Sequence, residues 1–252
     1  MAVTGPNTGF TVKDPNTGIT QDLGQRYVSK DYLIDVYPNI ASTLGSITSP
    51  GLRTYGSNLY GGLGNGTVTS YSSPIQVGSL TNWKQVSTCD RCTAAIKTDG
   101  TLWTFGSDGY GQLGNGTVTR YSSPIQVGSL TNWKQVACGY YHTTAIKTDG
   151  TLWTCGYNVP GQLGNGTVTS YSSPIQVGSL TNWKQVSCGR HNTAAIKTDG
   201  SLWTFGYNIE GGLGNGTVTN YSSPIQVGSL TNWKQVAAGY YHTAAILLSD
   251  IT

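Results

Sequence analysis

The segment "GNGTVTSYSSPIQVGSLTNWKQV", residues 64–86, returns three more times along the chain, each time 50 residues further on. Its four copies differ at a single position, which holds Ser70, Arg120, Ser170 and Asn220 in turn. Fixed periods of roughly 20–50 residues are typical of solenoids and propellers, in which each repeat is one small unit packed against its neighbours. The repetition therefore predicts an array of equivalent structural units.

Each repeat has the residue pattern of four short strands. In the second copy, "TLWTFGS" (101–107) alternates apolar and polar residues as a strand does, and "SSPIQVG" (122–128) and "NWKQVACG" (132–139) predict two more strands joined by a short turn. The segment "HTTAIKTDGTLWT" (142–154) predicts a strand, an Asp-Gly turn of type I′ and the first strand of the next repeat. Four short antiparallel strands per repeat correspond to one propeller blade.

The repeats also resemble a known family. The pattern "LWTFGSDGYGQLGNG…SSPIQV…WKQVACGYYHTTAIKTDG" recurs across residues 51–252 and is similar to the repeats of the regulator of chromosome condensation family. The resemblance implies a β-propeller in which tryptophan and leucine side chains pack between blades. Members of that family usually have seven blades, whereas this chain has four repeats.

We therefore expect an all-β protein, a β-propeller of four 50-residue blades with an extended N-terminal arm. The expected arm is 1–50, and the expected blades are 51–100, 101–150, 151–200 and 201–252. The first strand, "GLRTY", and the last, "HTAAILLSD", each lack the neighbour that interior repeats supply. Pairing them would remove two exposed edges. Closure of the ring within one chain is favoured, and the alternative is closure between chains, which gives a larger shared ring.

The composition excludes several classes of protein. Charged residues make up 10% of the chain, the net charge is +3, and the lysines are scattered singly. Nucleic-acid binding requires a dense basic patch, which this sequence lacks. No apolar run reaches the roughly 18 residues that a membrane span requires. We expect no nucleic acid as a partner and no insertion into a membrane.

The five cysteines do not suggest a disulfide framework. Cys138, Cys155 and Cys188 stand where other repeats carry threonine, alanine or an aromatic residue. A cysteine that alternates with such residues behaves as a small hydrophobic side chain, which favours a reducing compartment. Cys89 and Cys92 form a single C-x-x-C pair, which is too little for a zinc site.

No catalytic constellation emerges from the sequence. The histidines are His142, His191 and His242, and the first and last of these hold equivalent positions, where a hydrogen bond between blades is the simplest role. Any triad built on them would be copied in several repeats. We expect no enzymatic activity, no metal site and no cofactor.

Because the repeats are nearly identical, function is expected where they differ, which is mainly in loops. Propellers bind partners through loops on one face, and rigid aromatic side chains are common at the centres of such surfaces. The candidate partner-binding residues are Tyr60, Tyr110, Arg120, Tyr140, Tyr141, His142, Arg190, His191, Tyr240, Tyr241 and His242. The alternative is that these are merely tolerant surface positions. The seven tryptophans are assigned to the core.

Residues 1–50 do not match the repeats. They begin with a turn-rich polar tract, and the segment "SKDYLIDVYPNIAS" predicts a short helix capped at Ser29 and ended by Pro38. The candidate docking residues of this arm are Phe10, Tyr27, Tyr32, Leu33, Val36 and Tyr37. The run "DLGQRYVSKDYLIDVYPNIAS" resembles the N-terminal attachment segments of tailed-bacteriophage virion proteins, especially those of cyanobacterial phages.

The sequence as a whole predicts a non-enzymatic structural protein of a phage virion, of the fibre, decoration or collar type, made in the host cytoplasm. Its arm would dock on other virion proteins or join copies of the chain into a homo-oligomer, and its propeller would present loops to a host-surface or protein ligand. The alternative is a cellular propeller that serves as a protein-interaction module. Guanine-nucleotide exchange, the activity of the family's best-known member, is not carried over, because this sequence lacks that member's inserted wedge and basic tail.

Overall fold

The structure, a computed structural model, describes residues 11–13, 20–22 and 51–248. The chain divides into two compact units, Met1–Thr48 and Ser49–Thr252. In the described residues, no helix is long and apolar enough to cross a membrane.

In the first unit, the described residues form an antiparallel pair of strands. β1 (Thr11–Lys13) pairs with β2 (Thr20–Asp22), where the sequence predicted an extended tract. The helix predicted to start at Ser29 and all six candidate docking residues of the arm lie outside the described residues.

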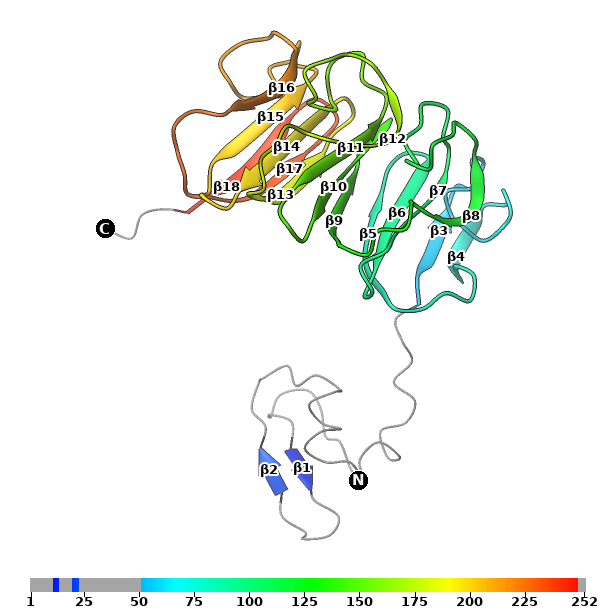
Figure 1. Cartoon of the computed structure of the whole chain (residues 1–252). Helices are drawn as coiled ribbons and strands as arrows, with labels where there is room; N and C mark the ends of the chain where they lie inside the picture. Colours follow the sequence, from blue (N-terminus) through cyan, green and yellow to red (C-terminus); the bar gives the residue numbers. More distant parts are fainter. Residues whose placement is uncertain (1–10, 14–19, 23–50, 249–252) are drawn as a thin grey trace. The chain divides into compact units, whose positions relative to one another are not determined.

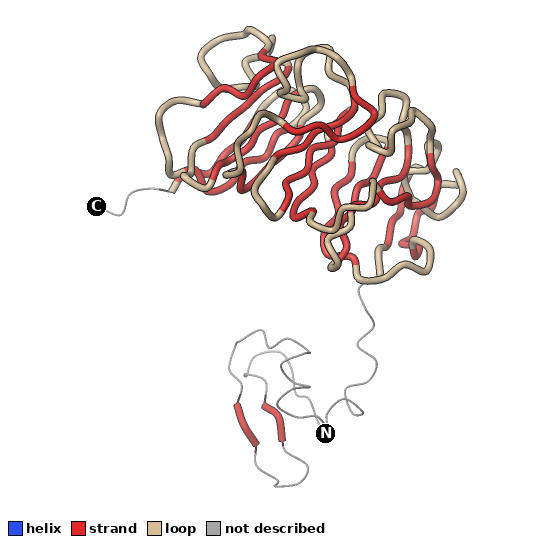
Figure 2. Tube along the Cα trace, viewed as in Figure 1, coloured by secondary structure: helices blue, strands red, loops and turns tan. Residues whose placement is uncertain are grey.

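The described part of the second unit consists of strands and loops (Figure 2). Its strands are β3 (Arg53–Gly56), β4 (Tyr71–Gln76), β5 (Trp83–Thr88), β6 (Cys92–Lys97), β7 (Leu102–Gly106), β8 (Tyr121–Gln126), β9 (Trp133–Cys138), β10 (His142–Lys147), β11 (Leu152–Gly156), β12 (Tyr171–Gln176), β13 (Trp183–Cys188), β14 (Asn192–Lys197), β15 (Leu202–Gly206), β16 (Tyr221–Gln226), β17 (Trp233–Ala238) and β18 (Thr243–Leu247). The predicted all-β class is confirmed, and so is the strand content of each repeat.

Each four-stranded sheet draws on two successive repeats. The sheets have the orders β5-β6-β7-β8, β9-β10-β11-β12 and β13-β14-β15-β16, and all neighbouring strands are antiparallel. The turn between β8 and β9 was expected to join strands of one blade, but these two strands belong to different sheets. The sheets are therefore offset from the 50-residue repeats, so each repeat is tied to the next by strand pairing.

The two ends of the array carry incomplete sheets. β3 pairs only with β4, and β17 pairs only with β18, so each forms a two-stranded sheet (Figure 1). The two half-sheets lie at opposite ends of an arc of sheets, and β18 is not paired with β3. The expected closure of the ring within one chain is therefore not found. The interior interfaces set the angle between successive sheets, and four repeats at that angle leave the ring open.

The turn between the second and third strands of a sheet is not of the predicted type I′. In the first one, Gly100 N donates to Lys97 O and Lys97 N donates to Thr101 O, each at 3.0 Å, and Gly100 alone in this turn has a positive φ, +80°. A type I turn followed by a left-handed glycine has this pattern. Glycine is required because a Cβ here would clash with Thr131 O. Gly100 O also accepts from Trp133 N at 3.0 Å, which fastens the turn to the next sheet.

The tryptophans divide between two environments. Trp83, Trp133 and Trp183, which begin the first strand of each four-stranded sheet, are buried, as the sequence predicted. The remaining four, Trp103, Trp153, Trp203 and Trp233, are only half-buried. A lysine ammonium lies over the first three of these, as where Lys197 Nζ is 3.4 Å from the Trp203 ring centroid. These cation–π contacts explain why indole rings suit positions that stay partly open to solvent.

The cysteines also divide into two groups. Cys138 and Cys155 are buried and free, and burial raises the pKa of the Cys138 thiol to about 11, so they behave as the small hydrophobic side chains that the sequence predicted. Cys89 and Cys92 instead form a disulfide across the loop between β5 and β6. The sequence did not predict this disulfide. Their spacing of three residues brings the two sulfur atoms together where the other repeats have glycine at the first position and histidine or asparagine at the second.

One repeat departs from the others at a buried loop position. Asn58, Asn158 and Asn208 each donate from Nδ2 to a neighbouring asparagine oxygen at 3.1 Å and to a threonine carbonyl oxygen at 2.9–3.0 Å. The second repeat has Asp108 there, 1% exposed, and its Oδ2 has no hydrogen-bond partner. Burial raises the pKa of Asp108 to about 6. The ionised carboxylate has no proton to donate at this position, whereas the amide of asparagine donates there in the other three repeats.

We expect Asp108→Asn to raise the free energy of unfolding by about 1–3 kcal/mol at neutral pH, because it supplies the missing donor. The folded-state pKa of Asp108 lies above its unfolded value of 3.8, so the aspartate weakens the fold above pH 6, and the advantage of Asn shrinks as the pH falls toward 4. Urea unfolding followed by circular dichroism at about pH 7.5 and about pH 4.5 measures both effects.

The matched control is Asp149→Asn. Asp149 accepts hydrogen bonds from the Thr151 hydroxyl and backbone N–H, and these bonds lower its pKa, so this variant should lose stability. The unpaired carboxylate is not the cause if Asp108→Asn fails to raise the free energy of unfolding at neutral pH, or if its effect grows on acidification.

Candidate functional site

The loops that precede the second strand of successive sheets converge on one region of the surface. The rings of Tyr140 and Tyr240, which are 100 residues apart in sequence, have centroids 6.3 Å apart. Tyr140 N donates to Gly189 O at 3.4 Å, which joins the loop between β9 and β10 to the loop between β13 and β14. The repeat geometry thus stacks equivalent loops side by side, and the residues that differ between repeats come together.

Aromatic rings form a continuous network there, which we call the tyrosine-rich surface. Tyr141 is its centre, with its ring centroid 4.3 Å from that of Tyr140, 4.9 Å from that of Tyr110 and 5.6 Å from that of His191. The members of the surface are Tyr110, Tyr140, Tyr141, Tyr157, Arg190, His191, Tyr207, Tyr240 and Tyr241. Most of these pairs are edge-to-face, the arrangement that aromatic quadrupoles favour.

Arg190 lies among three of these rings. Its guanidinium carbon is 4.4 Å from the Tyr240 ring centroid, 5.5 Å from that of Tyr140 and 5.9 Å from that of Tyr241. One terminal nitrogen donates to the Tyr241 hydroxyl at 2.7 Å, while Nε has no partner. The surface therefore holds a cation fixed by stacking and by one hydrogen bond.

His191 is neutral at physiological pH. Burial against the surrounding rings, followed by the nearby Arg190 charge, lowers the pKa of His191 to about 4. Its Nδ1 has no hydrogen-bond partner. The ring adds a polar but uncharged group to the surface, beside the fixed charge of Arg190.

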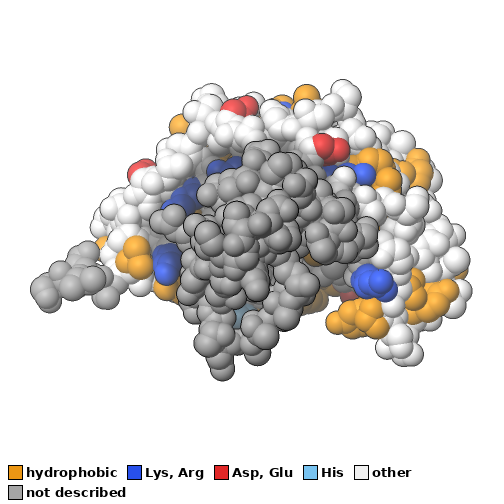
Figure 3. All heavy atoms as spheres, turned by 90° about the horizontal axis from the view of Figure 1, so that it is seen from below, with side chains coloured by type: hydrophobic (Ala, Val, Ile, Leu, Met, Phe, Trp, Pro, Cys, Tyr) orange, Lys and Arg blue, Asp and Glu red, His pale blue; other side chains and the backbone are white. Residues whose placement is uncertain are grey.

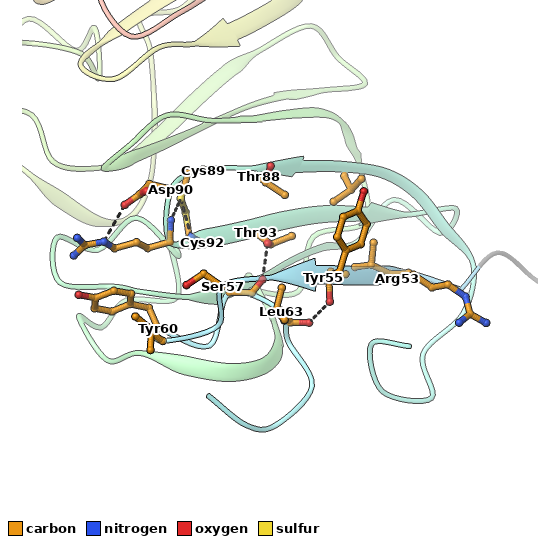
Figure 4. Close-up of a pocket in the computed structure, with 16 residues that line it drawn as sticks. Arg53, Tyr55, Ser57, Tyr60, Leu63, Thr88, Cys89, Asp90, Cys92 and Thr93 are labelled. Carbon is orange, nitrogen blue, oxygen red and sulfur yellow. Dashed lines mark hydrogen bonds and ion pairs between the residues drawn. A yellow bond between two sulfur atoms is a disulfide. The ribbon is translucent and has the colours of Figure 1, made fainter. Parts of the chain in front are cut away.

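A second group of residues adjoins this surface on the side of the first repeat (Figure 4). Asp90 accepts from Arg91 Nε at 2.9 Å, and the Arg91 guanidinium carbon lies 4.3 Å from the Tyr60 ring centroid. A hydrogen bond with Asp90 raises the pKa of Tyr140, which connects this group to the tyrosine-rich surface. The Asp90–Arg91 pair is exposed, and we assign it no large contribution to stability.

The structure gathers most of the predicted partner-binding residues but separates three. Tyr110, Tyr140, Tyr141, Arg190, His191, Tyr240 and Tyr241 belong to the tyrosine-rich surface, and Tyr60 belongs to the adjoining group. Arg120 is exposed and donates to Leu59 O at 3.3 Å, outside the ring network. His242 is exposed at the end of the array.

His142 is a correction, because it is fully buried and cannot meet a partner. Its Nε2 lies 2.9 Å from Thr193 Oγ1, and that hydroxyl already donates to Gln162 O. A threonine hydroxyl has one proton, so His142 Nε2–H is the donor of this bond. His142 therefore joins one repeat to the next, which is the simpler role that its repeated position indicated.

Tyr157 and Tyr207 belong to the tyrosine-rich surface but were not predicted from the sequence. Both follow the third strand of a sheet, and the first two repeats have Ser57 and Ser107 at the same position. The Tyr157 ring centroid is 4.9 Å from that of Tyr110, and that of Tyr207 is 6.1 Å from that of Tyr241. The change from serine to tyrosine between repeats was the signal that could have identified them.

The described residues contain no cluster of three or more His, Cys, Asp or Glu side chains that could hold a metal ion. The view in Figure 3 shows Lys and Arg side chains as separate groups among uncharged ones. The surface features that stand out are thus aromatic rings and a few fixed arginines, an arrangement suited to binding.

Four consecutive segments match the family model of the regulator of chromosome condensation (RCC1) repeat: residues 54–96, 99–146, 149–196 and 199–246. The chain belongs to this family. A second model of the RCC1 repeat matches residues 133–162 and 183–211. The resemblance of the repeats noted in the sequence is therefore confirmed. No curated protein sequence matches the chain.

Solved structures with a similar fold include one human protein and one yeast protein. Human WBSCR16 is 24% identical with a TM-score of 0.71, and the match covers 80% of this chain and 54% of that one. Prp20p of Saccharomyces cerevisiae is 18% identical with a TM-score of 0.69, and the match covers 79% and 52% of the two chains. The chain thus spans about half the length of these propellers, and the likeness establishes the fold.

Proposed function

We propose that the repeat unit is a protein-interaction module that acts by binding, without a catalytic step, through its tyrosine-rich surface. The observation that carries this proposal is the concentration of residues that differ between repeats into one connected set of rings around Arg190. Tyrosine and arginine are the residue types most enriched at the energetic centres of protein interfaces.

The partner class is supported by the solved propellers. Prp20p of Saccharomyces cerevisiae has binding properties toward Gsp1p and histones, and it has been solved as yeast RCC1 with Kap60 bound. Because this chain spans about half of such a propeller, those partners are not transferred to it.

The family matches all lie within residues 54–246. These matches do not support the expected virion role, its phage and host-surface partners, or its location in a virion. That role rested on residues 1–50, and we do not propose it here. A cellular interaction module, which was the alternative, fits the matched family.

The test compares proteins captured from a lysate of the source cells by the immobilised full chain and by a Tyr240→Ser/Tyr241→Ser variant. Both tyrosines are more than 40% exposed, so the fold should tolerate their loss. The matched control is Val118→Ser/Val168→Ser, two exposed residues outside the surface. We expect one or more proteins to bind the wild type and the control, and to bind the tyrosine variant at least about tenfold more weakly when purified. Equal capture by all three chains would overturn the proposal.

A further inference from the structure

Each interior repeat places a side chain against a glycine of the repeat before it. A Cβ on Gly64 would lie 2.6 Å from the Phe105 ring, and a Cβ on Gly164 would lie 2.6 Å from the Phe205 ring. Cys155 occupies this place in the third repeat. The three side chains are 0–3% exposed, so they act as knobs that fill pockets between successive sheets.

The two ends of the array each have half of this contact. Gly214 is the corresponding glycine of the last repeat, and a Cβ there would find only Val227, at 3.6 Å. An open pocket of about 320 Å³ lies beside it, lined in part by Leu202, Leu213 and Trp233. The corresponding side chain of the first repeat is Tyr55 on β3, which is 65% exposed (Figure 4). One end thus has an empty pocket, and the other has an aromatic side chain that fills no pocket.

Other apolar residues show the same asymmetry. Ile246 on β18 is 53% exposed, whereas its three equivalents, Ile96, Ile146 and Ile196, are fully buried. Val86 on β5 is 48% exposed, whereas its three equivalents, Val136, Val186 and Val236, are 2–4% exposed. Because the sequences are the same, the missing neighbour causes the exposure, and each end is an interior interface cut in half.

The polar contacts between repeats are complementary in the same way. Gly66 N donates to Ser122 O at 2.8 Å, and the Gln85 side-chain amide both donates to Val136 O and accepts from Val136 N. Each of these bonds recurs at the next interface. The groups that would continue the series are Gly216 and Gln235 in the last repeat and Ser72 and Val86 in the first.

The unpaired strand edges also match in sequence. In the interior, β14 and β15 pair with Ala194 opposite Thr204 and with Ile196 opposite Leu202. β18 and β3 carry the same residues at equivalent positions, which sets Ala244 opposite Thr54 and Ile246 opposite Leu52. A strand edge left open in this way is a template for another chain.

The two ends cannot meet within one copy without a change in the angle between sheets. They lie at opposite ends of the arc in Figure 1, and four repeats cover only 54% of the length of a matching propeller. Interior interfaces that are all alike give each further repeat the same rotation. A second copy would supply the neighbour that each end lacks, and eight repeats lie within the range of known propellers, about 4–8 blades.

We propose that two copies of this chain associate head to tail, β3 of each pairing with β18 of the other and Tyr55 of each filling the pocket at Gly214 of the other. The two contacts are identical, and together they close a ring of eight repeats. Each two-stranded sheet then becomes part of a four-stranded sheet shared between copies. A head-to-tail contact forms a ring only when its rotation closes, and otherwise it forms an open filament.

The solution mass of the full chain, measured by light scattering, tests this proposal. We expect twice the chain mass of 26.7 kDa, without further growth as the concentration rises. Tyr55→Asp should have the mass of one chain, because it replaces the ring that fills the pocket with a charge. Ile246→Asp should do the same from the other end. Both residues are exposed in one copy, so far-ultraviolet circular dichroism should be unchanged. The control is Val118→Asp, 62% exposed and away from both ends, which should keep the doubled mass.

Mixing the two variants adds a second readout. Tyr55→Asp keeps an intact last repeat and Ile246→Asp keeps an intact first repeat, so a mixture should recover dimers joined by one contact. A wild type with the mass of one chain would overturn the proposal, since the ends would then be free or joined within a copy. So would a doubled mass that survives Tyr55→Asp, which would assign association to another segment. Mass that grows without limit would indicate a filament rather than a ring.

Discussion

Replacing Trp183 with alanine lowers the free energy of unfolding by about 3–5 kcal/mol, the range for a large aromatic side chain removed from a packed core. Trp183 is 1% exposed and lies in a cluster with Leu152, Val177 and Phe205, which come from two successive repeats. Its ring also packs edge-on against Trp203, with centroids 6.3 Å apart. The loss combines the transfer of the indole to water with the cavity left between two sheets that share their packing.

Urea unfolding followed by far-ultraviolet circular dichroism measures this effect without relying on tryptophan fluorescence. The matched control is Val168→Ala in the same repeat, because Val168 is 58% exposed and should change the free energy of unfolding by no more than about 0.5 kcal/mol. A loss below about 1 kcal/mol for Trp183→Ala would mean that the sheets do not pack against each other as described.

Acidification destabilises the wild type relative to a His142→Asn variant. Burial is the main cause that lowers the pKa of His142 to about 3, with a smaller effect of His191. Nε2–H is committed to Thr193 and Nδ1 has no partner, so an added proton would be buried without an acceptor. Asparagine is a natural substitute, because Asn192 holds the equivalent position and donates to Thr243 Oγ1 at 3.5 Å.

The direction follows from the two pKa values. The folded-state value of about 3 lies below the unfolded value of about 6.5, so between these limits the unfolded chain takes up the proton. The stability is therefore fully present above pH 6.5 and is lost as the pH falls, by about 1.4 kcal/mol per unit. Relative to the variant, the wild type should lose about 2 kcal/mol between about pH 7.5 and about pH 5.

Taking the difference between two chains removes the other titrating groups from this measurement. Asp108 and His191 also have shifted pKa values, but both are present in the wild type and in the variant. Parallel curves of unfolding free energy against pH for the two chains would show that His142 is not the group responsible.

Much of the fold could be predicted because the same pattern of apolar and polar residues occurs in all four repeats. The alternation in "LWTF" and the apolar "AAI" segments placed β7 and β6 correctly, since local pattern determines a strand. The pairing of strands into sheets was not determined locally. β8 and β9 are adjacent in sequence but belong to different sheets. β8 pairs with the preceding strand, β7, across the long loop between them, and not with the following strand, β9.

The candidate site was predictable only in part, for a related reason. Tyr140, Tyr141 and Arg190 could be nominated because they differ between repeats, and the fold brings them together. The same criterion also nominated His142, whose burial depends on the loop of the following repeat. Sequence comparison between repeats identifies positions that vary, whereas only the packing of one repeat on the next separates a surface residue from an interface residue.

The two ends of the array are proposed to be halves of one interface, and one backbone amide reports on it. In β14, the backbone N–H of Lys197 donates to Ser201 O, on the side of β15. Every second N–H of a strand points to the same side, so the N–H of Ala195 also points toward β15. The equivalent amide of Ala245 therefore points to the open edge of β18. Its hydrogen exchange reports directly whether another strand is paired there.

Amide hydrogen exchange at Ala245, measured in concentrated and in dilute solutions of the full chain, is the most direct test. We expect slow exchange in the concentrated solution, comparable with that of Ala195, and fast exchange on dilution and in Tyr55→Asp. Fast exchange at every concentration would mean that the edge stays open. Slow exchange that is independent of concentration would mean that a single copy closes its own ring, and either result would rule out pairing between copies.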